Sequence, residues 1–216
     1  MSLVIEKFED GPIWTIGYLV YDEESREGMV VDVPMWSSEK IYKRTRELGL
    51  SIKHIVATHG HWDHIGEMER LAELMGAQVS ALRGDEWMMR DPNGMVIPPP
   101  EQIEPVNVDS FLDEKSILQI GKTSFSIIQT PGHSVGSLCL YAEEERLMFT
   151  GDTLFAGSIG RTDLPTGSME EISRSISEKI MSLSDDVRVL PGHGAESTLK
   201  KERAENRFVH MIFAEK

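Results

Sequence analysis

Short apolar stretches separated by glycine, proline and charged turns recur along the whole chain. Stretches of this length that are rich in branched and aromatic residues are typical of β-strands. The pattern therefore predicts many short strands. They span residues 12–23, 28–34, 52–58, 77–82, 116–120, 123–130, 137–143, 146–150 and 186–190.

Four other segments have the apolar spacing of amphipathic helices. They span residues 37–49, 66–76, 168–183 and 196–213. Gly49 and Gly76 are suited to end the first two, because glycine readily adopts the left-handed conformation that closes a helix. Ser168 and Glu171 form a capping box at the start of the third, and isoleucines at every fourth position of 172–180 form its apolar stripe.

Residues 83–110 interrupt this alternation, with five prolines and no clean period. This length is too great for a simple connection, so we expect a loop or flap. Its apolar residues, Trp87, Met88, Met89 and Met95, are expected to cover a cleft or to contact a second copy of the chain in a homodimer. Outside the flap, interspersed strands and helices predict one domain over residues 1–216, with two sheets packed face to face and helices outside.

The composition is that of a soluble globular protein. The 216 residues are 40% hydrophobic and 27% charged, which allows a substantial core. A net charge of −14 argues against a nucleic-acid or anionic-membrane surface. There is no apolar run of about 18 residues and no basic segment followed by an apolar stretch at the start. With Cys139 as the single cysteine, we expect a cytoplasmic protein in which this residue is a small core side chain.

Histidine and aspartate gather just beyond the ends of predicted strands. The stretch THGHWDHIG, residues 58–66, follows one strand, and three later strands each lead into one further histidine or aspartate. Loops at this edge of a mixed α/β fold are where ligands bind. The residues are His59, His61, Asp63, His64, His133, Asp152 and His193.

Imidazole and carboxylate groups without thiolate suit zinc, iron or manganese. His59 and His61 lie two residues apart, so their rings can point the same way, whereas Asp63 and His64 lie beyond, where the chain turns into a helix. Seven ligands are too many for one tetrahedral ion but suit two ions that share a carboxylate. A chance match to four such residues at fixed offsets has a frequency of about one in a hundred thousand. Taken alone, Asp63 could also be a helix N-cap.

Four motifs in this order, THGHWDH, PGHS, TGDT and PGHG, resemble the metallo-β-lactamase superfamily over nearly the whole chain. The resemblance implies a four-layer αββα sandwich of two mixed sheets with helices outside. It also implies two divalent ions, expected to be zinc, with iron or manganese as alternatives. One ion would be held by His59, His61 and His133, and the other by Asp63, His64 and His193, with Asp152 as the bridge.

Within this superfamily, TGDTLFAGSIGRTDLPTGS is most similar to the compact relatives of glyoxalase II, the hydroxyacylglutathione hydrolases. This implies hydrolysis of a thioester, a glutathione conjugate, by a metal-bound hydroxide, with Asp63 and Asp152 in catalytic positions. It also places Arg161 near the substrate, where it could hold a carboxylate of the thiol carrier. Lys200, Lys201 and Arg203 are close enough in sequence to His193 to assist. The sequence has no counterpart of the helical C-terminal domain of the longer enzymes after His193, so we expect fewer contacts with the thiol carrier and looser substrate choice.

Other interpretations stay open at this point. Arg161 could instead be a surface residue paired with Asp163. The GRTD motif also occurs in persulfide dioxygenases, whose single iron could be held by His59, His133 and Asp152. A nuclease is disfavoured by the acidic charge, and a β-lactamase by the lack of a secretion signal. A metal-binding protein without activity is the remaining alternative.

Overall fold

The computed structural model describes residues 2–214 and places six strands in a first mixed sheet. The strands lie in sequence order from one edge to the other, and they are antiparallel from β1 to β3 and parallel from β3 to β6. They are β1 (Leu3–Asp10), β2 (Thr15–Asp22), β3 (Glu27–Val31), β4 (Ser51–Val56), β5 (Gln78–Ala81) and β6 (Ser110–Phe111).

A second six-stranded sheet has the order β14-β13-β10-β9-β8-β7, with β10 and β13 parallel and the other pairs antiparallel. A small antiparallel pair, β11 (Leu154–Phe155) and β12 (Ser158–Ile159), follows β10. The strands of the second sheet are β7 (Ile117–Ile120), β8 (Thr123–Gln129), β9 (Leu138–Ala142), β10 (Leu147–Gly151), β13 (Arg188–Pro191) and β14 (Ser197–Thr198).

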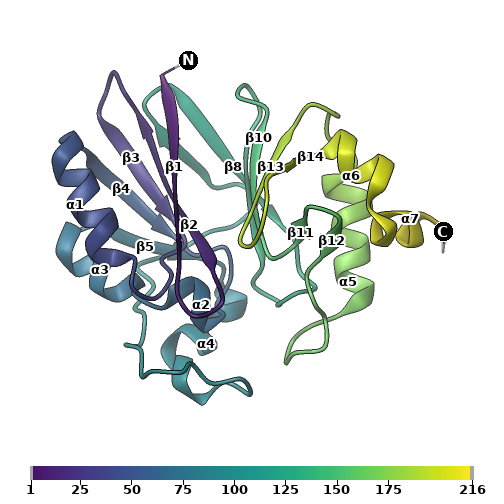
Figure 1. Ribbon diagram of the computed structural model, residues 1–216, viewed down its shortest axis with the longest axis horizontal. Helices are drawn as coiled ribbons and strands as arrows, with labels where there is room; N and C mark the ends of the chain where they lie inside the picture. The colour runs from purple at the N-terminus through teal and green to yellow at the C-terminus, as the bar shows by residue number, and fades with distance from the viewer. Residues whose placement is uncertain (1, 215–216) are drawn as a thin grey trace.

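Helices cover the outer face of each sheet (Figure 1). On the first sheet lie α1 (Ser38–Leu48) and α3 (Met68–Met75); on the second lie α5 (Met169–Arg174), its π-helical continuation η3 (Ser175–Ile180), α6 (Leu199–Glu205) and α7 (Arg207–Ala214). Two short helices, α2 (Trp62–Ile65) and α4 (Glu86–Arg90), lie at the lower edge in this view. The predicted αββα sandwich is therefore confirmed.

Strand β2 is buried on both faces, so its residues 16–20 are apolar or glycine rather than alternating with polar ones. Tyr18 points between the sheets, where its ring meets Phe149 edge-on with centroids 5.0 Å apart. Its hydroxyl donates to the carbonyl of Pro191 in the other sheet, at 2.7 Å. The next residue, Leu19, points to the opposite face and packs with Ile41 of α1. The two-residue period of the strand thus supplies both the central and the outer core.

The helix ends predicted from glycine and serine are present. Gly49 and Gly76 both adopt the left-handed conformation after α1 and α3. Ser168 accepts a hydrogen bond from the backbone N–H of Glu171, and the isoleucine stripe of residues 172–180 is fully buried against the second sheet. Cys139 is a buried core residue, as predicted.

Several elements differ from the sequence prediction. Strand β1 was not predicted, because its two faces are both half-covered at the sheet edge and its sequence has no clean period. The segment 83–110 is not irregular throughout, since it contains η1 (Arg83–Asp85), α4 and η2 (Pro92–Gly94). The last predicted helix is two helices. Asn206 separates them, because its side chain accepts from the N–H of Phe208 and donates to the carbonyl of Ser158.

No helix in residues 2–214 combines the length and the apolar character that crossing a membrane requires.

Candidate metal centre

All seven residues predicted from the motifs lie together at one edge of the sandwich. Each is placed there by the end of a strand or by α2: the first two follow β4, the next two lie in α2, and the last three follow β8, β10 and β13. The loops that follow strands of both sheets therefore meet at this edge of the sandwich. The residues are His59, His61, Asp63, His64, His133, Asp152 and His193.

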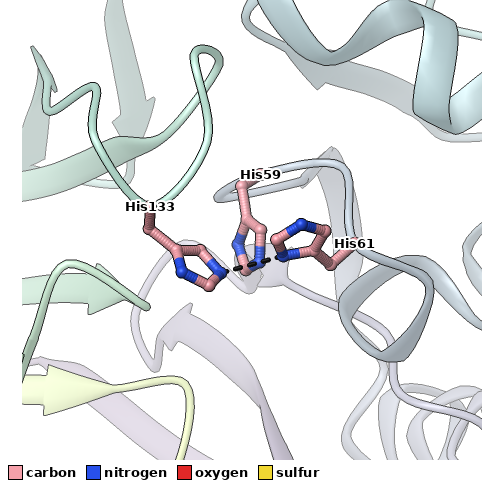
Figure 2. Close-up of side chains that lie close together, drawn as sticks. All are labelled: His59, His61 and His133. Atoms are coloured by element: carbon pink, nitrogen blue, oxygen red, sulfur yellow. Dashed lines mark hydrogen bonds between the residues drawn. The ribbon is translucent and has the colours of Figure 1, made fainter. Parts of the chain in front are cut away.

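Three of the imidazoles face one another (Figure 2). His59 lies with its ring centroid 4.8 Å from those of both His61 and His133, and Nδ1 of His61 is 2.8 Å from Nε2 of His133. All three side chains are buried, and their candidate ligand atoms lie within 4.8 Å of one another. This is a set of nitrogen donors that one metal ion could occupy.

A second group lies beside the first. Oδ2 of Asp63 is 3.2 Å from Nε2 of His193 and 3.3 Å from Nε2 of His64. Asp152 reaches both groups, because its Oδ1 is 3.2 Å from Nε2 of His64 while its Oδ2 is 3.5 Å from Nε2 of His133. A carboxylate in this position could be shared by two ions.

Three buried atoms of this cluster have no hydrogen-bond partner among the described residues: Nε2 of His59, Nε2 of His64 and Oδ1 of Asp152. A buried polar atom without a partner costs about 1–3 kcal/mol. Cations held at this cluster would give all three atoms a partner. The positions of these ligand atoms therefore fit a bound metal ion.

The pKa values of the clustered histidines are also consistent with a bound metal ion. Burial, and then the neighbouring imidazoles, lower the pKa of His61 to about 4 and the pKa of His59 well below its usual range. These rings are neutral at pH 7 and keep a free lone pair. Burial alone would lower the pKa of His64, but carboxylates, led by that of Asp63, raise it well above its usual value. The carboxylates thus favour positive charge in the place where a divalent ion would sit.

Residues outside the predicted set fix the orientation of the candidate ligand side chains through hydrogen bonds. Asp32 accepts from Nδ1 of His64 at 2.7 Å, so Nε2 of that ring is left facing the cluster. Thr58 donates its hydroxyl to Asp32 and lies 3.1 Å from Nδ1 of His59, which in turn leaves Nε2 of His59 free. Nδ1 of His133 bonds to the carbonyl of Arg161 at 2.8 Å. Such outer contacts fix the tautomer and raise the basicity of ligating imidazoles.

Sequence reasoning missed Asp32, although a signal was present. Asp32 directly follows β3, as Asp152 directly follows β10, so the rule that collects residues beyond strand ends would have included it. The alternative role of Asp63 as a helix N-cap is not realised. His61 occupies the cap position of α2, and Asp63 accepts instead from the hydroxyl of Thr15 in β2, at 2.8 Å.

Asp85 joins the two histidine loops. It lies in η1 at the start of the 83–110 segment and is 1% exposed. Its carboxylate accepts from the N–H of Gly60 at 2.9 Å, the N–H of Gly136 at 2.8 Å and the hydroxyl of Ser134 at 2.5 Å. Gly60 lies between His59 and His61, and Ser134 follows His133. Part of the predicted flap is therefore structural support for the site.

A cavity of about 220 Å³ opens over the cluster. The 83–110 segment contributes Trp87, Met88 and Met95 to its wall, whereas Met89 points away into the outer core of the first sheet. Leu164 and Pro165 line another side.

Arg161 also lines this cavity, and its guanidinium is held by both carboxylate oxygens of Asp163, at 2.7 and 2.8 Å. The other basic residues proposed from sequence lie elsewhere. Arg203 bonds to Asp185 and to the carbonyl of Leu183, and neither Lys200 nor Lys201 belongs to the part of the cavity wall that the structure describes.

Comparison with known proteins shows which family the sequence matches. The sequence profile of the metallo-beta-lactamase superfamily matches residues 18–193, a range that contains all seven clustered residues. The hydroxyacylglutathione hydrolase GloC of Haemophilus influenzae is 32% identical over 202 residues, which cover 89% of this chain and 91% of GloC.

Two solved structures are similar over almost their full length. BLEG-1, a B3 metallo-beta-lactamase, has a TM-score of 0.86 and 31% identity, covering 95% of this chain and 99% of its own. TTHA1623, solved in a di-iron-bound form, has a TM-score of 0.80 and 31% identity, covering 94% of this chain and 99% of its own. The arrangement of the sheets is thus one that other solved proteins share.

Proposed function

The chain belongs to the metallo-beta-lactamase superfamily, whose members are generally metal-dependent hydrolases, and we propose that it hydrolyses a thioester of the hydroxyacylglutathione type. His59, His61 and His133 would hold one ion, and Asp63, His64 and His193 a second, with Asp152 shared between them. Zinc is the proposed metal. Iron is the main alternative, because a relative with 31% identity has been solved with two irons.

One observation carries this proposal. Asp152 lies between two complete groups of candidate ligands, with Oδ1 and Oδ2 at 3.2 and 3.5 Å from imidazole nitrogens of different groups. Oδ1 and two imidazole nitrogens nearby are buried without partners. A site for one ion needs only three or four of these seven side chains. The complete second group supports two ions.

A pair of divalent ions in this site would lower the pKa of a water molecule and polarise a substrate carbonyl. The protein's own part is to keep His59 and His61 neutral, to keep Asp63 and Asp152 ionised, and to leave one side of the cluster open to the cavity.

The reaction adds one water to the thioester carbonyl and breaks the C–S bond, giving a carboxylate, a thiol and one proton that is released to solvent. A thiol has a pKa of about 8.5, so thiolate can leave without a dedicated acid, whereas an amide nitrogen needs one. Apart from the candidate metal ligands, the described residues of the cavity wall include no histidine, lysine, tyrosine, aspartate or glutamate that could serve as that acid. This composition favours thioesters over amides.

Similarity to GloC supports glutathione as the thiol carrier. The proposed contact on this chain is Arg161, which lines the cavity. A carboxylate of the carrier would compete with Asp163 for that guanidinium, since the two form a bidentate pair.

The competing function is oxidation of a persulfide at a single iron held by His59, His133 and Asp152. Metal analysis together with two assays separates the two functions. We expect two ions per chain and release of thiol from S-lactoylglutathione. A protein with one iron per chain that consumes oxygen with glutathione persulfide and leaves the thioester intact would contradict the proposal.

A further inference from the structure

The cavity beside the metal cluster has a strongly apolar wall. Its polar groups are confined to the ligand end and to Arg161. Four of the apolar side chains that line it are also exposed to solvent: Val96 is 74% exposed, Trp87 47%, and Ile97 and Ile13 each 45%. Exposed apolar residues are common singly, but a group of them around a concave site marks a surface that binds an apolar ligand.

The loop that carries Val96 and Ile97 is held in place. At its base, the Asn93 side chain donates to the carbonyl of Ile103 at 2.8 Å and accepts from the N–H of Ile103 at 3.0 Å. Met95 packs onto a buried cluster that contains Trp62 and Ile103. Three prolines follow Ile97 and restrict the backbone further. This part of the apolar wall is therefore preformed, which lowers the entropy cost of binding.

The wall has little charge available to bind a polar acyl group. Of the described residues that line the cavity, Arg161 is the only lysine or arginine, and Asp163 already holds its guanidinium. Beyond the ligand cluster, a small hydroxyacyl group such as lactoyl would leave most of the apolar wall, from Trp87 to Ile97, in contact with water.

We propose that this wall is an acyl-binding site, and that the preferred substrates are thioesters with an apolar acyl chain that fits a cavity of about 220 Å³. The thioester carbonyl would lie at the ligand cluster, and the chain would extend along Trp87, Met95 and Ile97. This inference rests on the proposed thioester hydrolysis and refines its substrate class, because an apolar acyl chain would then be preferred over a small hydroxyacyl group such as lactoyl.

The test is a chain-length series on the metal-loaded protein. Acyl thioesters of N-acetylcysteamine, a small uncharged thiol, are compared from acetyl to decanoyl. Each methylene that the wall removes from water should raise kcat/KM about fourfold. The increase should stop once the cavity is filled. A kcat/KM that is flat or falls with chain length, in a protein that does hydrolyse thioesters, would overturn this inference and leave the proposed function intact.

Two variants show where the chain binds. Ile97→Ser should weaken the dependence on chain length, because a polar group replaces part of the wall. Ile117→Ser is the matched control, since Ile117 is also exposed, at 65%, but lies on β7 and is absent from the described cavity wall. It should keep the wild-type dependence. Equal dependence on chain length in both variants would contradict the assignment of the wall.

A binding measurement separates this inference from the proposed function. S-alkyl thioethers of N-acetylcysteamine cannot be hydrolysed, and their affinity can be measured by calorimetry. Affinity should rise with alkyl length, and Ile97→Ser should reduce that rise. If affinity rises with alkyl length and Ile97→Ser reduces that rise, while no thioester is hydrolysed, the apolar site is supported and thioester hydrolysis is contradicted. If affinity is independent of alkyl length, the apolar site fails whatever the enzyme hydrolyses.

Discussion

Oδ2 of Asp32 lies 2.7 Å from Nδ1 of His64, and both side chains are buried to at least 98%. This contact joins the end of β3 to the ligand helix α2. It fixes which nitrogen of His64 faces the cluster, because a ring that donates through Nδ1 can offer only Nε2 to a metal.

Asp32→Asn is therefore expected to lower metal affinity about 10- to 100-fold with little loss of fold. Asparagine tolerates the left-handed backbone at this position, where φ is 58°, so the change tests the carboxylate rather than the turn. Calorimetric titration of the metal-free protein measures the effect. Asp22→Asn is the control, since Asp22 is similarly buried, and among residues 2–214 its side chain bonds within the β2–β3 turn and to Ser2, far in sequence from the clustered ligands. Similar affinity in the two variants would show that Asp32 has no role at the site.

Asp152 should be needed for both ions. Asp152→Ala should bring the metal content to one ion per chain or fewer and lower kcat by about 100-fold or more. Asp152→Asn keeps the shape but removes the charge and should have a smaller effect in the same direction. Elemental analysis combined with thioester hydrolysis measures both. Two tightly bound ions in the alanine variant would refute the shared position.

Gly192 allows the backbone after β13 to approach the ligands closely. A Cβ there would lie 2.4 Å from Cε1 of His64 and 2.6 Å from Oδ1 of Asp152. Gly192→Ala should cost about 1–3 kcal/mol of stability and reduce metal content, because the ligands must move. Gly194→Ala is the comparison: its Cβ meets nothing within 4 Å, although its φ of 76° carries strain. It should lose stability but keep its metal.

The pair Arg161 and Asp163 should control affinity for anionic carriers. With S-lactoylglutathione, Arg161→Ala should raise KM about three- to tenfold and change kcat less, because a charge contact made equally in ground and transition states affects binding. Asp163→Ala should lower KM, since it frees the guanidinium. Arg174→Ala controls for surface charge, because Arg174 pairs with Glu170 away from the cavity. If KM is unchanged in both Arg161→Ala and Asp163→Ala, the substrate role is excluded.

Glu6 and Arg44 connect β1 to α1 through two hydrogen bonds of 2.7 Å. The contact with Arg44 lowers the pKa of Glu6 below its usual 4.5. A carboxyl group with a lowered pKa stabilises the fold above the usual value, and this contribution disappears as pH falls below 4.5 through the lowered pKa. Glu6→Gln should therefore reduce stability by about 0.5–1 kcal/mol at pH 7 and by almost nothing at pH 3. Urea unfolding at both pH values tests this, and an equal loss at both would contradict it.

The amino-acid sequence determined those features that depend on local spacing. The apolar periods located most strands and helices, as in β2 and α1, and Gly49 and Ser168 marked helix ends correctly. The seven clustered residues could be predicted from the sequence because each follows a predicted strand or lies within six positions of a residue that does. Strands β8, β10 and β13 run in the same direction in the second sheet, so the residues that follow them reach the same edge.

Tertiary structure decided what depends on contacts between distant segments. Asp32 supports His64 across 32 positions, and Thr15 bonds to Asp63 across 48. The pairing of Arg161 with Asp163, which the sequence left open, is settled by the conformation of one loop. The apolar cavity is formed by residues from Ile13 to His193. Periodicity describes neighbours along the chain, whereas a cavity wall and a supporting hydrogen bond require two surfaces to meet, which only the packed fold specifies.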